Sequence, residues 1–217
     1  MKKSKAIVVI GGGGHAKVVV GLLKKMNCFD ILGYTDKADL GPLLGVTWLG
    51  NDSCLTSVLK NYPDCQAALG IGSVDLSSNR AKVMRAIEAM GLFFPPVVSP
   101  SAIVNEGVRL GPGTVVMDGA VIQPGTQIGK GCIVNTRSVV EHDCLVGDDV
   151  HIAPGVVLCG GVEVGSGSFI GAHSTVIPYK RIAPLVLIGA GSLVLDVCGE
   201  PGTYFGIPAQ KQSPVYG

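Results

Sequence analysis

The chain of 217 residues has little charge and no long apolar run. Charged residues make up 15% of it and the net charge is +1, so nothing indicates a nucleic-acid or anionic-membrane partner. Although 47% of the residues are hydrophobic, no stretch approaches the 18 apolar residues that a membrane span needs. The apolar run 6–10 is also too short for the core of a signal peptide. We therefore expect a cytoplasmic protein that neither inserts into membranes nor binds nucleic acid.

Paired cysteines are missing as well. The seven cysteines are odd in number, scattered, and contain no C-x-x-C pair, which does not suit a disulfide framework or a zinc finger. Cys132 and Cys144 fall on the small position of the repeat described next, so we predict buried free thiols there. We therefore expect the protein to work in a reducing compartment.

An aliphatic residue returns at every sixth position from Val98 to Val194, sixteen steps without a miss. This period fits neither an amphipathic helix nor a strand, and it is typical of parallel β-helix repeats. The residue two before each aliphatic is usually small, and the residue three after it is often glycine, which tolerates positive φ at a corner. We predict a triangular prism of about five coils, with residues eighteen apart stacked on one another. At 179–181 two cations interrupt the pattern, and we expect a loop or an irregular corner there.

The residues before the repeat predict a strand, a glycine loop and a helix. The β-branched run 6–10 suits a strand buried on both faces, Gly11–Gly14 follow, and a helical pattern covers 17–26. In this context backbone N–H groups at the helix N-terminus hold a phosphate. A second strand at 31–35 ends at Asp36, close to the spacing at which a ribose-binding acid is expected.

Two more predicted helices (52–59 and 79–90) and a strand (67–71) complete only one mononucleotide-binding half. A proline-rich hinge at 94–100 and the sixfold repeat stand where the second half of a dinucleotide fold is needed. We therefore predict an α/β Rossmann-like domain at 1–95 followed by a β-helix domain with a C-terminal tail at 96–217.

Four stretches, 9–17, 99–102, 135–144 and 206–209, together resemble the nucleotide-aminosugar N-acetyltransferases of the PglD, NeuD and PerB type. The resemblance covers essentially the whole chain. It implies a left-handed parallel β-helix, a homotrimer and an active site between neighbouring subunits. It also implies that acetyl-CoA donates an acetyl group to the amine of a nucleotide-linked sugar, with UDP-linked 4-amino-4,6-dideoxy sugars as the expected acceptors.

His142 matches the catalytic base of this family. An amine that attacks a thioester must lose a proton, and histidine is suited to accept it near neutral pH. Asp143 matches the acid that orients the imidazole, and Glu141 remains a competing candidate for that role. Without the resemblance, His142 reads as an ordinary solvent-exposed corner residue.

The resemblance also assigns both substrates. The acetyl-CoA site comprises His151, Gly160, Ala172 and Ala190. His151 is alternatively a structural corner histidine, and the three small residues alternatively serve only packing. The sugar-nucleotide site comprises Gly13, Gly14 and His15 at the diphosphate, Thr35 and Asp36 at the uridine, Gly72 and Ser73 across the cleft, and Asn135. Backbone N–H groups of the glycine-rich coils would stabilise the oxyanion, and Asn135 alternatively caps a corner. The family often has an acid in place of Thr35 and an asparagine in place of Ser73, which bears on nucleotide preference.

Three other functions compete with N-acetylation. A zinc enzyme of the γ-carbonic anhydrase type needs three histidines on adjoining coils, whereas His142, His151 and His173 are spaced by 9 and 22 residues, so we expect no metal. O-acetylation of a sialic-acid-like sugar shares nearly every motif. The third is a catalytically silent structural trimer, in which His142, Asp143 and the glycine loop would have no reason to occur together.

Overall fold

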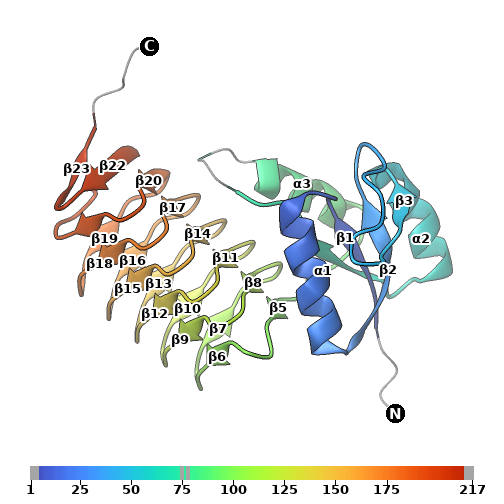
Figure 1. The fold of residues 1–217 in the computed structure, drawn as a ribbon, viewed down its shortest axis with the longest axis horizontal. Coiled ribbons are helices and arrows are strands. Elements are labelled where there is room, and N and C mark those ends of the chain that lie inside the picture. The colour runs from blue at the N-terminus through green and yellow to red at the C-terminus, as the bar shows by residue number, and fades with distance from the viewer. Residues whose placement is uncertain (1–4, 74–75, 77–78, 213–217) are drawn as a thin grey trace. The chain divides into compact units, whose positions relative to one another are not determined.

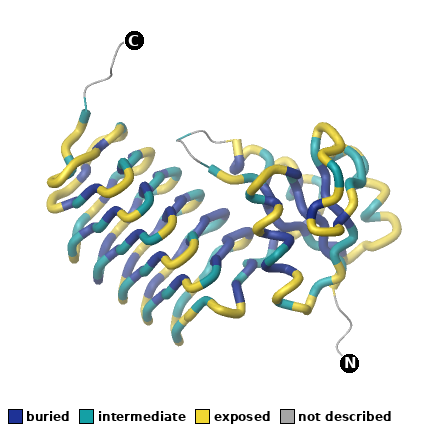
Figure 2. The backbone as a smooth tube through the Cα atoms, viewed as in Figure 1, coloured by how far each residue is buried: buried dark blue, intermediate teal, exposed yellow. Residues whose placement is uncertain are grey.

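The computed structural model describes residues 5–73, 76 and 79–212, which form two compact units. The first unit contains residues 5–72 and 79–100, and the second contains 73, 76 and 101–212. Each unit has its own buried core, visible as dark blue segments in Figure 2.

The first unit is built on a parallel sheet of order β3-β2-β1-β4 (Figure 1). The strands are β1 (Lys5–Ile10), β2 (Phe29–Thr35), β3 (Trp48–Gly50) and β4 (Gln66–Leu69). β1 is central, and its last four residues are at most 1% exposed, as its continuous β-branched sequence predicts. The short edge strand β3 was not expected from the sequence.

Helices cover both faces of this sheet. They are α1 (Gly14–Met26), the short 3-10 helix η1 (Asp52–Cys54), α2 (Leu55–Asn61) and α3 (Asn79–Ala89). α1 buries Val19, Val20 and Leu23 on one side, whereas Leu55 of α2 and Met84 of α3 join the core cluster on the other. The unit ends with β5 (Val97–Val98). Strand β1, the glycine loop and α1 therefore follow one another as predicted.

The second unit is a left-handed parallel β-helix with three sheets (Figure 1). One sheet contains β7 (Arg109–Leu110), β10 (Gln127–Ile128), β13 (Leu145–Val146), β16 (Glu163–Val164) and β19 (Arg181–Ile182). A second contains β8 (Val115–Val116), β11 (Ile133–Val134), β14 (His151–Ile152), β17 (Phe169–Ile170) and β20 (Val186–Ile188). The third contains β6 (Ile103–Val104), β9 (Val121–Ile122), β12 (Val139–Val140), β15 (Val157–Leu158), β18 (Thr175–Val176) and β21 (Leu193–Val194). Paired residues are eighteen apart, as in Ile133 with His151, so three hexads make one coil.

The sixfold aliphatics fill the prism, and the small residues complete its corners. Val134, Val140 and Val146, for example, are at most 5% exposed. The small inward side chains donate hydrogen bonds to carbonyls fifteen residues further on, as Thr126 Oγ1 does to Glu141 O at 2.8 Å. Cys144 Sγ does the same to Cys159 O at 3.3 Å, and it is a buried free thiol as predicted. Small side chains are needed there because they must both fit and satisfy the turning backbone.

Each corner between two strands has three outer residues, here called the first, second and third corner positions. The third position has positive φ at every sixth residue from Gly107 to Gly191, without a gap. Glycine occupies most of these positions, because a Cβ is costly in the left-handed region. Six corners carry a larger residue instead: Arg137, Asp143, Asp149, His173, Tyr179 and Leu185.

The loop expected at 179–181 is absent. Tyr179 occupies an ordinary third corner position with φ 59°, and β19 pairs in register with β16. Arg181 does not disturb the coil because its side chain points outward and is exposed. After β21 the tail adds β22 (Gly202–Gly206) beside β20, followed by the antiparallel strand β23 (Ala209–Lys211). Among the described residues, no helix has the length and apolar character needed to cross a membrane.

Candidate active site

His142 and Asp143 form a side-chain pair at the corner between β12 and β13. His142 Nδ1 lies 2.9 Å from Asp143 Oδ2, and the two side chains are 53% and 72% exposed. A carboxylate only accepts hydrogen bonds, so it holds the proton of the neutral ring on Nδ1 and leaves Nε2 with its lone pair free. The partner of the imidazole is thus Asp143 rather than Glu141. Asp143 has a left-handed backbone with φ 59°, so one of the non-glycine residues in this uncommon conformation is a member of the candidate site.

The ring of His142 lies against bare backbone on the next coil. A Cβ placed on Gly160 would be 2.6 Å from His142 Nε2, so only glycine leaves room for the imidazole in this position. The peptide between Gly160 and Gly161 is fixed on both sides, because Gly161 N–H donates to His142 O and Tyr179 N–H donates to Gly160 O, both at 2.9 Å. Nε2 therefore faces the main chain at Gly160.

The N–H of Gly160 is not needed by the coil. Proline, which has no N–H, occupies the second corner position at five other corners, namely Pro112, Pro124, Pro154, Pro178 and Pro184. Within the described residues, Gly160 N–H likewise forms no hydrogen bond. A donor is thus available beside Nε2.

The two cysteines beside this corner are poor nucleophiles. Burial raises the pKa of Cys144 to about 11. The pKa of Cys159 is also raised, first by burial and then by the charge of Glu141. A thiol must lose its proton to attack a thioester, so acyl transfer through either cysteine is disfavoured.

His151 is buried on β14 rather than presented at a corner. Its Nδ1 lies 2.5 Å from Ser73 O and its Nε2 lies 3.0 Å from Asn135 Nδ2, while its ring packs edge-on against Phe169. Asn135 Oδ1 in turn accepts Thr136 N–H at 2.7 Å. These partners fit a neutral imidazole protonated at Nδ1. Of the residues predicted for the two substrates, Asn135, His151 and Ser73 thus lie together in one network.

Ala172 and Ala190 occupy the second position of another corner, one coil apart, as the eighteen-residue spacing predicts. Ala190 is exposed and Ala172 is half-buried. This corner joins the sheet of β17 to the sheet of β18, so it differs from the corner that carries His142 and Gly160. The four predicted acetyl-CoA residues are therefore distributed over two corners and one strand.

The glycine loop at the start of α1 leaves open space. Gly13, at the N-cap, and Gly14 are exposed, and a Cβ on either would meet nothing within 4 Å. Gly12 N–H donates to Asp36 Oδ2 at 2.7 Å, which ties the loop to the end of β2. His15 is the second residue of α1, and its side chain lies beside Gly72, which is exposed. The first N–H groups of α1 thus face solvent, the arrangement that binds a phosphate.

Thr35 is fully buried, and its hydroxyl donates to Asp52 Oδ1 at 2.6 Å. Asp52, at the start of η1, is the partly exposed member of this pair and was not singled out from the sequence. Its position right after the asparagine that caps η1 was the available signal. Two carboxylates, Asp36 and Asp52, therefore lie next to the carboxyl end of β2.

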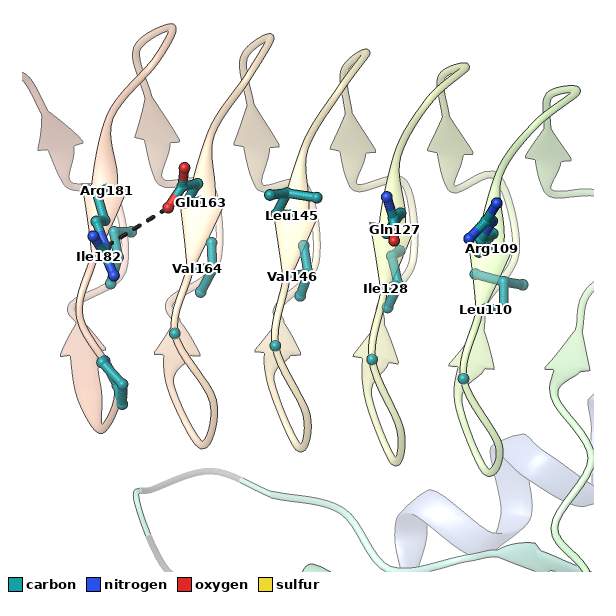
Figure 3. Close-up of a pocket in the computed structure, with 15 residues that line it drawn as sticks. Arg109, Leu110, Gln127, Ile128, Leu145, Val146, Glu163, Val164, Arg181 and Ile182 are labelled. Atoms are coloured by element: carbon teal, nitrogen blue, oxygen red, sulfur yellow. Dashed lines mark ion pairs between the residues drawn. The ribbon is translucent and has the colours of Figure 1, made fainter.

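A shallow groove of about 530 Å³ runs along the sheet of β7, β10, β13, β16 and β19 (Figure 3). The outward side chains stacked along it are Arg109, Gln127, Leu145, Glu163 and Arg181. Arg181 Nε and Glu163 Oε2 are 3.6 Å apart, an exposed pair of the kind that contributes about 0–1 kcal/mol. None of the residues predicted for catalysis or substrate binding lines this groove.

The three histidines considered for zinc lie on different features of the β-helix. His142 and His173 are at separate corners and His151 is on a strand. Within residues 5–73, 76 and 79–212, no group of three or more His, Cys, Asp or Glu side chains is arranged to hold a metal ion.

Known proteins match both units of the chain. The PglD N-terminal domain family matches residues 6–87, and the bacterial transferase hexapeptide family matches 107–142 and 143–178. Perosamine N-acetyltransferase from Caulobacter crescentus, in a histidine-to-asparagine variant solved with CoA and GDP-perosamine, is 34% identical. The match covers 96% of this chain and 97% of that one, with a TM-score of 0.90. This chain belongs to the PglD/NeuD/PerB family of acetyltransferases.

A second relative of this acetyltransferase has the same architecture. The acetyltransferase domain of PglB from Neisseria gonorrhoeae FA1090, solved with acetyl coenzyme A, is 29% identical. The match covers 97% of this chain and 100% of that domain, with a TM-score of 0.86. WeeI from Acinetobacter baumannii AYE, at 22% identity and a TM-score of 0.73, shares the fold. The chain is accordingly a hexapeptide-repeat acetyltransferase that uses acetyl-CoA.

Proposed function

We propose that this acetyltransferase modifies the amine of a nucleoside-diphosphate-linked sugar, with His142 as the general base. The observation that carries the proposal is the His142–Asp143 pair, whose free Nε2 faces the bare backbone of Gly160. A base must have its lone pair available at the atom that receives the proton, and the carboxylate of Asp143 ensures this. Histidine variants of the Caulobacter enzyme that hold CoA and GDP-perosamine support this assignment.

In the proposed reaction the sugar amine attacks the carbonyl carbon of the thioester. A carbon–nitrogen bond forms, the amine proton passes to His142 Nε2, and the carbonyl oxygen becomes negative. When the carbon–sulfur bond breaks, the proton on Nε2 passes to the departing sulfur, which leaves as a thiol. Asp143 stabilises the imidazolium that exists between the two transfers.

The N–H of Gly160 supplies the donor for the negative oxygen. It lies beside the base and forms no hydrogen bond within the described residues. The carbonyl of the same peptide, Cys159 O, accepts a hydrogen bond from Cys144 Sγ at 3.3 Å, which holds the peptide in place. Such a preorganised donor needs no rearrangement as charge develops. Gly160 thus contributes both space for the imidazole and a hydrogen-bond donor. We assign the remaining acetyl-CoA contacts to His151, Ala172 and Ala190.

The open glycine loop would hold the diphosphate of the acceptor. Gly13, Gly14 and His15 present the N-terminus of α1, where N–H groups and the helix dipole favour an anion. Asp36 would meet the nucleoside together with Thr35 and its partly exposed partner Asp52, while Gly72, Ser73 and Asn135 complete the predicted acceptor site. UDP is the nucleotide expected from the sequence, whereas the Caulobacter relative was solved with a GDP-sugar. Both nucleotides therefore belong in the assay.

The experiment follows thiol release from acetyl-CoA with UDP-, GDP- and dTDP-linked amino sugars. We expect turnover on at least one amino sugar and a loss of about 10²- to 10⁴-fold in kcat for His142→Ala. Glu106→Ala is the matched control, because Glu106 is exposed at the second position of the same corner two coils earlier. Full activity of His142→Ala, or no turnover on any amino sugar, would contradict the proposal.

O-acetylation of a sialic-acid-like sugar is tested in the same assay. Free sialic acid is offered beside the nucleotide sugars, and the acetylated product is identified by its stability to mild base, which cleaves esters and leaves amides. An ester product would replace the present proposal with the alternative.

We further propose that the enzyme is a homotrimer and that it works in the cytoplasm. The family resemblance supports the trimer, and the seven free cysteines suit a reducing compartment. Light scattering of the purified full chain measures the assembly directly, and a monomeric or dimeric mass would exclude the trimer.

A further inference from the structure

Side chains at the third corner position lean back over the preceding coil. The contact is seen at five corners, where a Cβ on the glycine eighteen residues earlier would lie within 3.3 Å of the larger side chain. The pairs are Arg137 over Gly119, Asp143 over Gly125, His173 over Gly155, Tyr179 over Gly161 and Leu185 over Gly167. A larger residue in the left-handed conformation thus needs glycine beneath it.

At the proposed catalytic corner this rule concerns Asp143. A Cβ on Gly125 would lie 2.4 Å from Asp143 Oδ1 and 3.4 Å from its Cγ. The other carboxylate oxygen, Oδ2, is the one that pairs with His142 Nδ1 at 2.9 Å. The backbone of Asp143 cannot yield easily, because its N–H donates to Pro124 O at 3.1 Å. A methyl group at 125 must therefore rotate the carboxylate away from the imidazole.

We propose that Gly125 is a positioning residue for the transfer reaction, acting through Asp143 on His142. This inference rests on the proposed role of His142 as base. Gly125 lies one coil before the pair and touches neither the imidazole nor a proposed substrate-binding residue. Its contribution is the space that lets Asp143 set the tautomer of His142.

Gly107 offers a matched control on the same corner. It precedes Gly125 by one coil and has nearly the same φ, 79° against 78°. A Cβ on Gly107 would meet only Gly125 N at 3.8 Å, an ordinary contact. Alanine at either position has the same unfavourable backbone conformation, but only alanine at 125 presses on the carboxylate.

The first test compares Gly125→Ala with Gly107→Ala in the full chain. We expect similar falls in Tm for both variants, and a kcat lower by roughly 10- to 100-fold for Gly125→Ala alone, with little change in the KM for acetyl-CoA. Equal kcat values for the two variants would overturn the proposal.

The second test places Gly125→Ala in an Asp143→Gly background, where the carboxylate is gone and glycine suits the left-handed backbone. We expect no further loss of kcat from the alanine there. A loss as large as in the wild-type background would show a merely structural effect and overturn the inference. If Gly125→Ala alone folds poorly, comparing Asp143→Gly with the Asp143→Gly/Gly125→Ala double variant still tests the positioning role.

A third measurement does not depend on catalysis. Long-range ¹⁵N–¹H correlations of the His142 ring report which nitrogen carries the proton. We expect the Nδ1–H form in the wild type and in Gly107→Ala, and a mixture in Gly125→Ala. An unchanged tautomer in Gly125→Ala would refute the positioning role. Activity that persists in His142→Ala would instead refute the proposed function and leave this readout valid.

Discussion

Glycines in the two units serve opposite purposes. At the start of α1, Gly13 and Gly14 leave a space that no protein atom fills within 4 Å of a placed Cβ. On the β-helix, the same placed atom at Gly125 or Gly160 would collide with Asp143 or His142. We propose that the open glycines leave room for a ligand, whereas the crowded glycines leave room for the side chains proposed for catalysis. Substitution by alanine should therefore affect binding in one unit and turnover in the other.

Among the glycine substitutions, the largest effect is expected from Gly160→Ala. Its methyl group would displace the His142 ring, and we predict a kcat lower by about 100-fold. The fold should persist, because φ at Gly160 is not positive and alanine occupies the equivalent position at 172 and 190. Steady-state kinetics and thermal unfolding measure the two quantities, with Glu106→Ala as control. A variant with normal kcat would show that the imidazole does not need this glycine.

Gly11→Ala should show that not every glycine of the first unit is an open one. Gly11 belongs to the glycine loop, yet its φ is 99° and a Cβ there would lie 2.9 Å from Ile71 Cγ1. We predict a loss of about 1–2 kcal/mol in the free energy of unfolding, because a non-glycine residue is strained in this conformation. Urea denaturation measures the loss. Unchanged stability would mean that the loop adapts, and Gly11 would then count as an open glycine.

Gly14→Ala should show the behaviour expected of an open glycine, which is a change in substrate binding without a change in turnover. Alanine is the better helix former and meets nothing within 4 Å, so the variant should be at least as stable as the wild type. A methyl group at the helix N-terminus nevertheless keeps a diphosphate from approaching the N–H groups. We predict a KM for the nucleotide sugar raised roughly 5- to 10-fold, about 1–1.4 kcal/mol, with kcat and the KM for acetyl-CoA unchanged. A normal KM for the nucleotide sugar would show that the diphosphate does not bind at this loop.

Periodicity predicted the β-helix because each coil repeats the same physical problem. An aliphatic side chain fills the prism, a small side chain closes the corner, and positive φ is required at every third corner position. The expected loop at 179–181 was wrong for the same reason. Tyr179 adopts the left-handed conformation like any other third corner residue, and Gly161 beneath it provides the space.

The site was less accessible to sequence reasoning, because many of its contacts join residues far apart in the sequence, such as Asn135 with His151 and His142 with Gly160. Asp143 and Glu141 flank His142 equally in sequence, and only the left-handed backbone of Asp143 selects between them. Similarly, the hydrogen bond between Asp52 and Thr35 depends on where η1 begins relative to β2. Glycine beneath each larger corner residue is a usable signal, since it can be read at a spacing of eighteen.

The smallest effect is expected at the C-terminal hairpin of β22 and β23. Lys211 Nζ lies 2.5 Å from Glu200 Oε2, and this hydrogen bond with its charge lowers the pKa of Glu200 below 4.5. A lowered carboxyl pKa gives stability that is present above 4.5 and is lost as the pH falls through the folded-state pKa. Lys211→Met should therefore lower Tm slightly at pH 7 and not at all once Glu200 is protonated, with kcat and both KM values unchanged. Thermal unfolding from pH 7 to pH 3 checks this, and a Tm difference that persists at the lowest pH would assign the effect to packing of the lysine stem rather than to charge.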